Sequence, residues 1–302
     1  MRRAVLLTGP TASGKSELAM RIAERDNGVV INADALQVYD CWRVLSARPS
    51  ETDTVRAPHA LYGHVSANIR YSVGNWLDDL APLLGTLEAA GQRPIIIGGT
   101  ALYLTALTSG LADIPPIEPE VRRLSQAMID GGRLAAMIAD LERLDPRTHA
   151  RIDLANPMRV QRAWEVLRST GRSLTQWQDE TPPPMLPRTG CACFVVHPAV
   201  PAQHAAIEAR FRKMVTLGAL DEARDFLASG VSETMPSARA LGAEDLMRHL
   251  RGECSLEDAI ARAVTVTRQF SKRQRQWFRG RMADWDWIDP ADGDPLKRIP
   301  PE

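Results

Sequence analysis

Three apolar runs near the start of the chain alternate with two segments of helical periodicity. The runs are AVLLTG (4–9), GVVINAD (28–34) and PIIIGGT (94–100). Residues 14–25 follow the first run, and residues 71–91 carry leucine and tryptophan at the spacing of one helical face. Apolar runs without polar alternation are typical of strands buried on both faces of a parallel sheet. The pattern therefore predicts an α/β fold with helices flanking a parallel sheet.

The pattern changes after residue 114. From there to residue 187 the chain has helical segments without a strand pattern, bounded by proline-rich stretches. The apolar run CACFVVHP (191–198) resumes the strand pattern, and further helices follow, the last over 256–278. We therefore expect an α/β core formed by residues 1–114 and 188–302, with an inserted all-helical subdomain at 115–187 and a helical C-terminal region.

The ends of the three apolar runs carry the first candidate functional residues. In an open parallel sheet the carboxyl ends of the strands line the ligand crevice, which places Gly9, Asp34 and Thr100 on one rim. Asp34 could act there as a general base, or it could cap the helix that DALQ would begin. Thr100 could bind a substrate oxygen, or it could be the N-cap of the helix in ALYLTAL. The pattern alone leaves these alternatives open.

The first strand leads into a phosphate-binding sequence, GPTASGKS, which matches G-x-x-x-x-G-K-[ST] at every fixed position. In such a P-loop the backbone N–H groups surround an anion, and the following helix adds positive partial charge. Lys15 brings a full charge to the outer phosphates, and the Ser16 hydroxyl is placed to ligate Mg²⁺. The predicted diphosphate or nucleotide site is Gly9, Pro10, Thr11, Ala12, Ser13, Gly14, Lys15 and Ser16.

The P-loop by itself does not identify its ligand. The N-K-x-D motif typical of GTPases is absent, and a hydrolytic ATPase would need an acid at a strand end, for which only Asp34 qualifies. From the P-loop alone, the first choice is an ATP-binding small-molecule or nucleotide kinase in which Asp34 activates a hydroxyl acceptor.

Positive charge gathers near the C-terminus, although the whole chain has a formal net charge of +0. A neutral total excludes a histone-like protein that coats nucleic acid. Residues 262–281 nevertheless contain seven arginines and lysines and no acid, which favours a polyanion partner. Four of these cations fall on one predicted helical stripe: Arg268, Lys272, Arg275 and Arg279.

Aromatic and basic residues on two predicted helices have alternative interpretations. Phe270, Trp277 and Phe278 are expected to be core anchors rather than platforms for base stacking. Arg159 and Arg162 share one face of the helix in NPMRVQRAWEVL, where phosphate contact and ordinary solvent exposure are equally compatible with the pattern.

The cysteines and the lengths of the apolar stretches predict the cellular compartment of the protein. The four cysteines, Cys41, Cys191, Cys193 and Cys254, form no C-x-x-C pair, and we expect reduced structural thiols. The apolar run at the N-terminus is too short for a signal peptide, and no stretch is long enough to span a bilayer. These features predict a soluble, cytoplasmic protein with no membrane association.

Seven segments together resemble the tRNA dimethylallyltransferase (isopentenyltransferase) family. They are GPTASGKS, NADALQVY, PHALYG, PIIIGGTALYL, NPMRVQRAWEVL, RFRKMVTLGALDEA and TRQFSKRQRQWFRG, in the family's order and spacing. The resemblance implies a P-loop kinase-like core with a helical insertion that grips the tRNA anticodon stem-loop. It also implies transfer of the dimethylallyl group from dimethylallyl diphosphate to the exocyclic N6 amine of the adenosine 3′-adjacent to the anticodon, with release of diphosphate.

The resemblance also assigns roles to individual residues. Asp34 matches the base that takes the amine proton, and Thr100 matches the threonine near the bridging oxygen of the donor. Lys15, Arg210, and Ser16 with Mg²⁺ match groups on the diphosphate. The family's tRNA contacts fall on Asp34, Ala35, Leu36, Gln37, Thr100, Arg122, Met158, Arg159, Val160, Gln161 and Arg162. To these contacts the basic stripe adds Arg268, Lys272 and Arg275, and we expect the protein to be a monomer.

Three segments depart from the family's pattern. Ala35 stands where serine is common, and VLSARPS (44–50) replaces DIGTAKP, with Arg48 where lysine is usual. PHALYG replaces a pattern closer to PHHLID, so Gly63 supplies no carboxylate. These changes motivate a third hypothesis beside the prenyltransferase and the kinase, namely a tRNA-binding protein whose catalysis has lapsed.

Overall fold

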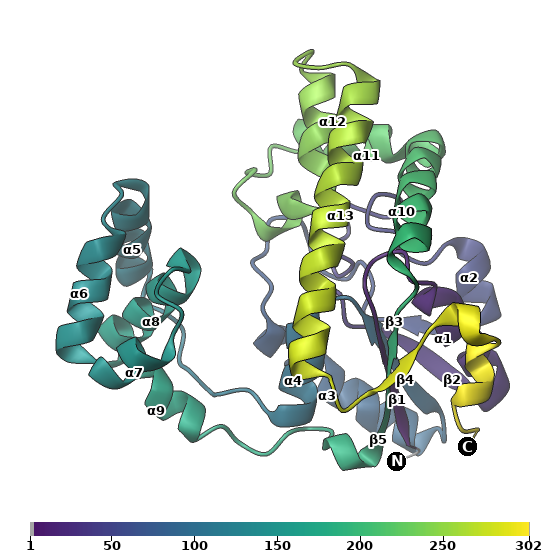
Figure 1. Cartoon of the computed structure of the whole chain (residues 1–302), viewed down its shortest axis with the longest axis horizontal. Helices are drawn as coiled ribbons and strands as arrows, with labels where there is room; N and C mark the ends of the chain where they lie inside the picture. The colour runs from purple at the N-terminus through teal and green to yellow at the C-terminus, as the bar shows by residue number, and fades with distance from the viewer. Residues whose placement is uncertain (1–2, 302) are drawn as a thin grey trace. The chain divides into compact units, whose positions relative to one another are not determined.

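In the computed structural model, which describes residues 3–301, six parallel strands form one sheet in the order β3-β2-β4-β1-β5-β6 (Figure 1). The apolar runs predicted β1, β2, β4 and β5. The two edge strands were missed because they are only two and three residues long, too short for a recognisable pattern. The strands are β1 Ala4–Thr8, β2 Gly28–Asn32, β3 His59–Ala60, β4 Arg93–Gly98, β5 Cys191–Val196 and β6 Asp286–Ile288.

Contacts along the chain divide it into two compact units. One unit combines the chain up to Thr108 with the chain from Met185 onwards, and the other is Ser109–Pro184. The second unit is the all-helical insertion, for which the sequence suggested residues 115–187. The first unit contains the whole sheet, so the insertion interrupts the core between β4 and β5.

Helices account for most of the remaining chain. The first unit contains α1 Lys15–Asp26, α2 Glu51–Arg56, α3 Val73–Ala89, α4 Ala101–Ser109, α10 Val200–Met214, α11 Leu220–Ala228, α12 Ala243–Leu250 and α13 Leu256–Arg281. The insertion contains α5 Pro119–Asp130, α6 Leu134–Leu144, α7 Pro146–Arg151, α8 Pro157–Thr170 and α9 Leu174–Asp179. Within residues 3–301, the structure has no helix with the length and apolar character that crossing a membrane requires.

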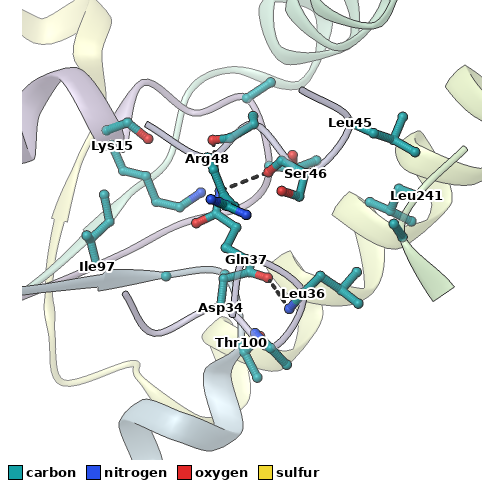
Figure 2. Close-up of a pocket in the computed structure, with 18 of the residues that line it drawn as sticks. Lys15, Asp34, Leu36, Gln37, Leu45, Ser46, Arg48, Ile97, Thr100 and Leu241 are labelled. Atoms are coloured by element: carbon teal, nitrogen blue, oxygen red, sulfur yellow. Dashed lines mark hydrogen bonds between the residues drawn. The ribbon is translucent and has the colours of Figure 1, made fainter. Parts of the chain in front are cut away.

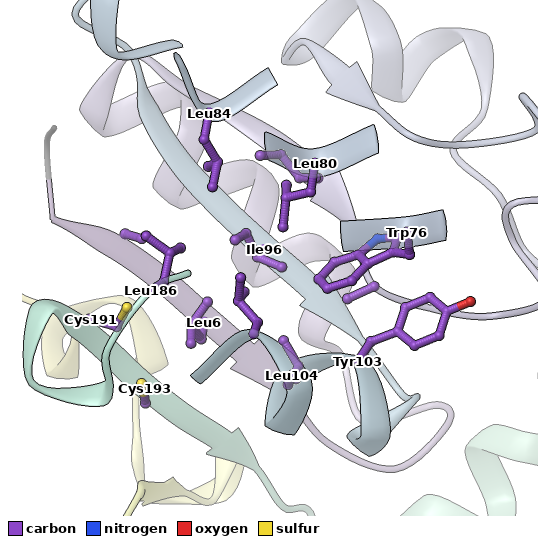
Figure 3. Close-up of a cluster of buried hydrophobic side chains, with 14 of the residues drawn as sticks. Leu6, Trp76, Leu80, Leu84, Ile96, Tyr103, Leu104, Leu186, Cys191 and Cys193 are labelled. Atoms are coloured by element: carbon purple, nitrogen blue, oxygen red, sulfur yellow. The ribbon is translucent and has the colours of Figure 1, made fainter. Parts of the chain in front are cut away.

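Side chains that alternate along the strands build a core on each face of the sheet. Leu6 and Ile96 pack with Trp76, Leu80 and the start of α4 on one face (Figure 3). The next residues along each strand point the opposite way and pack against α1. The burial of both faces explains why the strand runs lack polar alternation.

The C-terminal helices form a further apolar cluster with the loop after β2. Trp42 stacks on Phe226 of α11 with ring centroids 4.8 Å apart, and its indole N–H donates to the Ser237 carbonyl at 2.8 Å. Helix α13 packs along α10 and α12 in the same unit (Figure 1). This packing brings residues from the last third of the chain to the carboxyl edge of the sheet.

The insertion has its own core, with Trp164 and Val160 of α8 among its buried side chains. Asn156 caps α8 by accepting from the Arg159 N–H, Pro157 occupies the first turn, and Gly171 ends the helix in a left-handed conformation. The sequence predicted this start from the Asn-Pro pair.

Candidate active site

A cavity of about 640 Å³ opens at the carboxyl ends of β1, β2 and β4. The order of strands reverses beside β1, whose neighbours are β4 and β5, and such a switch point is where open α/β sheets bind ligands. Lys15, Asp34 and Thr100 line this cavity together (Figure 2). The predicted common rim is therefore confirmed for Asp34 and Thr100.

The P-loop turns from β1 into α1 through two left-handed residues, Ala12 at φ 59° and Gly14 at φ 86°. A smaller hollow of about 310 Å³ lies over this turn and is bordered by Ser13, Ser16 and Arg210. The Ser13 hydroxyl is buried and has no hydrogen-bond partner among residues 3–301. An anion in the hollow would be bound by the backbone N–H groups of such a turn.

Two cations from distant parts of the sequence meet at the P-loop. The pKa of Lys15 is lowered to about 8, chiefly by burial and also by the nearby Arg210, while the Asp34 carboxylate opposes both effects. Burial also lowers the pKa of Arg210, while Asp34 raises it. The Lys15 ammonium donates only to the Pro10 carbonyl, at 3.3 Å, and Arg210 makes no hydrogen bond or ion pair in the described chain. Two desolvated cations at one hollow, which the single Asp34 carboxylate only partly offsets, favour a multiply charged anion as the ligand.

Asp34 is held by the short loop that follows β2. Its Oδ1 accepts the N–H of Leu36 at 3.0 Å, and its own N–H donates to the Asn32 side chain at 2.9 Å. The Asn32 amide in turn donates to the Asp34 carbonyl at 3.0 Å. Asp34 Oδ2 accepts no hydrogen bond within residues 3–301, so this oxygen is available to a proton donor in the cavity.

Thr100 joins the end of β4 to the same loop. Its hydroxyl oxygen accepts the backbone N–H of Ala35 at 3.0 Å, which leaves the hydroxyl hydrogen free to donate. Because the Ala35 donor is a backbone group, the serine that the family pattern has at this position is not needed for the bond. Ala35 therefore leaves the geometry at Thr100 intact.

Two buried glutamines that the sequence analysis did not single out hold the P-loop from behind. Gln274 of α13 accepts the Thr11 N–H at 3.0 Å and donates to the Gly99 carbonyl at 2.9 Å. Gln203 of α10 donates to the Thr11 carbonyl at 2.8 Å. Nothing in the local pattern distinguishes these amides from their exposed neighbours, because their partners come from distant parts of the sequence.

The donor set of the site fits a magnesium ion that arrives with a phosphate ligand. In the described chain, no group of three His, Cys, Asp or Glu side chains could hold a metal by itself. Ser16 is exposed at the first turn of α1 and borders both hollows with Lys15. Mg²⁺ commonly keeps several waters and takes other ligands from substrate phosphates, so the Ser16 hydroxyl suits this role.

The aromatic residues of α13 do not all belong to the core. Phe278 is fully buried, as predicted, but Phe270 and Trp277 are half-buried and line the cavity. The Arg273 guanidinium lies 5.8 Å from the centre of the Phe270 ring and also lines the cavity. The prediction that all three rings are core anchors is therefore wrong for Phe270, whereas Trp277 packs against the core beside Phe278 and also lines the cavity.

The prediction that four cations of α13 form a basic stripe on the surface is partly wrong, because α13 packs against α10. Arg275 is buried and donates to Gln203 of α10 and, at 2.7 Å, to Ser271. Arg268 forms an ion pair with Glu208 of α10 at 2.9 Å. Only Lys272 and Arg279 of the four are exposed. The local charge count failed for Arg268 and Arg275 because these two face α10, which supplies the Glu208 carboxylate and the Gln203 amide.

Arg275 is expected to stabilise the fold. Replacing it with alanine would leave the Gln203 oxygen without its buried donor, which costs about 1–3 kcal/mol. We expect Arg275→Ala to lower the free energy of unfolding in urea by that amount and Lys272→Ala to change it by less than about 0.5 kcal/mol. Equal values for the two variants would contradict this assignment.

Only some of the residues of the insertion that were predicted to contact tRNA have exposed side chains. Val160 is fully buried, and the buried Gln161 amide donates to Ser125 at 3.0 Å and to Glu165 at 3.2 Å. Their side chains therefore serve the core of the insertion, contrary to the prediction that they contact tRNA. Four other side chains of the predicted set are exposed: Arg122, Met158, Arg159 and Arg162.

Two of the departures from the family pattern are in contact. Arg48 lines the cavity, and its guanidinium donates to the Tyr39 carbonyl at 3.0 Å and to the Asp40 carbonyl at 3.2 Å. Gly63 lies against this guanidinium in a left-handed conformation, and a Cβ there would be 2.2 Å from the Arg48 Cζ. The arginine therefore occupies the space that a side chain at position 63 would need.

This contact predicts that positions 48 and 63 are coupled. We expect Gly63→Asp to destabilise the protein by about 1–3 kcal/mol, the usual cost of overpacking. The cost should be smaller when Arg48→Lys, which restores the usual residue of the family pattern, is combined with it. Urea unfolding of the two single variants and the double variant measures the coupling, and identical costs in both backgrounds would show that the two positions are independent.

Comparison with known proteins identifies relatives over nearly the whole chain. A family model described as IPP transferase matches residues 37–281, and one described as isopentenyl transferase matches residues 2–59. A tRNA dimethylallyltransferase of Dinoroseobacter shibae is 56% identical over 95% of each chain. Another, from Cereibacter sphaeroides, is 54% identical over 95% of this chain and 88% of the relative.

Solved structures are similar in fold. The full-length tRNA isopentenylpyrophosphate transferase of Bacillus halodurans superimposes with a TM-score of 0.69 at 27% identity, covering 99% of this chain and 93% of the other. A eukaryotic dimethylallyltransferase acting on tRNA gives a TM-score of 0.83 at 22% identity, over 99% of this chain and 77% of the other.

Proposed function

This chain belongs to the tRNA dimethylallyltransferase family and is a tRNA prenyltransferase, and we propose that its P-loop binds the diphosphate of dimethylallyl diphosphate. The observation that carries the proposal is the shared cavity of Lys15, Arg210, Asp34 and Thr100. It combines an anion hollow with a free carboxylate oxygen. The P-loop then serves to hold a leaving group.

The acceptor that we propose is the N6 amine of the adenosine 3′-adjacent to the anticodon. A bond forms between this nitrogen and the first carbon of the dimethylallyl group as the bond from that carbon to the diphosphate oxygen breaks. The nitrogen loses a proton, and Asp34 Oδ2 is the group available to take it. An exocyclic amine is a poor nucleophile, so its orientation and the removal of its proton both matter.

The departing diphosphate gains negative charge, and three groups are placed to stabilise it. Lys15 and Arg210 supply full charges in a partly desolvated hollow, where such charges act strongly. The free hydroxyl hydrogen of Thr100 is placed to donate to the bridging oxygen. Magnesium held by Ser16 and the diphosphate would add charge stabilisation of the same kind.

We propose the tRNA anticodon stem-loop as the macromolecular partner of a monomeric, cytoplasmic enzyme. On the insertion, Arg122 and Arg162 are exposed. Burial lowers the pKa of Arg162, the Glu165 carboxylate raises it and Arg122 lowers it, so a phosphate beside the two arginines would stabilise both charges. At the cavity, Phe270, Trp277 and Arg273 offer ring faces and a cation of the kind that unstacked bases contact. Such contacts predict binding that weakens with added salt.

The kinase and lapsed-enzyme alternatives are not favoured by the two relatives described above, both of which carry the transferase name. A binding experiment tests the donor directly. Dimethylallyl diphosphate, titrated calorimetrically with Mg²⁺, should bind the protein more tightly than ATP and should displace it. Preferential binding of ATP would favour the kinase and overturn the proposal.

The depressed pKa of Lys15 predicts how donor binding depends on pH. The Lys15 pKa of about 8 means that the free protein loses this charge as the pH rises through that value. The donor's last ionisation, near pH ~6 for a phosphate monoester, is complete by then. The dissociation constant for dimethylallyl diphosphate should therefore be flat near pH 7 and rise above pH 8, by about tenfold per unit at most. A pH-independent constant up to pH 9.5 would contradict the Lys15 contact.

A further inference from the structure

Gln274 is a buried side chain of α13 that the reaction described above does not use. It makes two hydrogen bonds, accepting from the Thr11 N–H at 3.0 Å and donating to the Gly99 carbonyl at 2.9 Å. The orientation of its amide is fixed, because an N–H needs the oxygen and a carbonyl needs the NH₂ group. One side chain thus connects the P-loop to the end of β4.

The two ends of this bridge lie next to groups that act in the reaction. Thr11 belongs to the loop that ends in Lys15, and Gly99 immediately precedes Thr100. The approach is close, since a Cβ at Gly99 would lie 2.6 Å from Gln274 Nε2 and 3.3 Å from Asp34 Oδ2. The glycine therefore leaves room for the amide and the carboxylate on the same side of β4.

We propose that Gln274 is a positioning residue that sets the spacing between the diphosphate cradle and the Thr100–Asp34 pair. Thr100 in turn holds the loop of Asp34 through the Ala35 N–H at 3.0 Å. The chain of contacts runs from Thr11 through Gln274, Gly99 and Thr100 to Ala35. It connects the group that holds the donor with the group that receives the acceptor's proton.

Two packing features keep the bridge rigid. Gln274 is 7% exposed, so water does not compete for its amide. The helix that carries it is anchored to α10 by Arg275, which donates to Gln203, and Gln203 holds the Thr11 carbonyl at 2.8 Å. Thr11 is thus held at both its N–H and its carbonyl by amides from two helices. The reaction needs this precision because a misplacement of about 1 Å can cost roughly 100-fold in rate.

The inference rests on the proposed function for the identity of the donor, and it is tested by Gln274→Met in the full chain. Methionine has a similar volume and removes both hydrogen bonds. Gln276→Met, at an exposed position of the same helix, is the matched control. We expect kcat to fall roughly 10- to 100-fold in Gln274→Met and to change by less than about twofold in the control. Donor affinity should change by less than the rate.

Repeating the Gln274→Met substitution in a Thr100→Ala protein distinguishes a positioning role of Gln274 from a general structural role. In a Thr100→Ala protein, the group that Gln274 positions has been removed, so Gln274→Met should cost much less than in the wild type. The same loss in both backgrounds would overturn the inference, as would a wild-type rate in the single variant.

A readout that does not depend on activity separates failure of this inference from failure of the proposed function. Amide hydrogen exchange at Thr11 should be faster in Gln274→Met than in the wild type. In Gln274→Glu, which keeps the acceptor and loses the donor to Gly99, protection at Thr11 should persist while kcat falls. Unchanged exchange at Thr11 in Gln274→Met overturns the bridge itself. A wild-type protein without prenyl transfer, but with the expected exchange, overturns only the proposed function.

Discussion

Replacement of Asp34 by asparagine should reduce prenyl transfer by roughly 100-fold or more, the usual scale for a positioned general base. Asparagine keeps the size of the side chain and can still accept the Leu36 N–H through Oδ1, so the loop after β2 should retain its conformation. It cannot take a proton from the amine at neutral pH. The reduction should therefore appear in kcat, with tRNA binding retained.

Asp40→Asn provides the control, because Asp40 is an exposed carboxylate on the same connecting segment. Its rate should stay within about twofold of the wild type, as for most surface substitutions. Single-turnover transfer with saturating tRNA and donor measures the chemical step for each variant. An unchanged rate in Asp34→Asn would remove Asp34 from the mechanism.

Loss of the Lys15 charge should have the second large effect. Lys15→Met removes one of the two cations at the diphosphate hollow, where a single lost stabilising group typically costs about 10²- to 10³-fold in rate. The charge matters more as the donor bond breaks than in the bound donor, so kcat should fall along with donor affinity. The pH dependence of donor binding between pH 7.5 and 9.5 should also disappear in this variant.

The matched substitution is Lys213→Met on α10, where the lysine is exposed. Its transfer rate should equal that of the wild type at low and high pH. A Lys15→Met protein that retained transfer within about fivefold of the wild type would contradict a diphosphate bound in the P-loop.

The elements at the centre of the sheet were predictable because their patterns are local. β1, β2, β4 and β5 are apolar runs, and the P-loop is a complete motif between a strand and a helix. β3 and β6 form by pairing with strands already in place, so their two or three residues carry no periodicity of their own. A segment this short becomes a strand because it pairs with a neighbouring strand, and its own sequence pattern does not indicate this.

The candidate site was predictable where the chemistry lies at strand ends, and not where it depends on helix packing. Asp34 and Thr100 follow from the rim rule for parallel sheets. The burial of Arg275 and the ion pair of Arg268 depend on α10, whose Gln203 and Glu208 lie 72 and 60 residues earlier in the sequence. Gln274 gave no signal because an amide between two backbone groups has no sequence pattern.

The central claim is that the P-loop binds the diphosphate leaving group of the prenyl donor rather than a nucleotide. Following the carbon atoms of the dimethylallyl group tests this claim most directly. The protein is incubated with unmodified tRNA, Mg²⁺ and dimethylallyl diphosphate labelled in its dimethylallyl group, and the tRNA is then digested to nucleosides. A parallel incubation contains labelled ATP in place of the labelled donor. We predict that the label appears in the adenosine 3′-adjacent to the anticodon and that labelled phosphate from ATP enters no acceptor. Unlabelled tRNA, or transfer of phosphate from ATP to a small acceptor, would contradict this account.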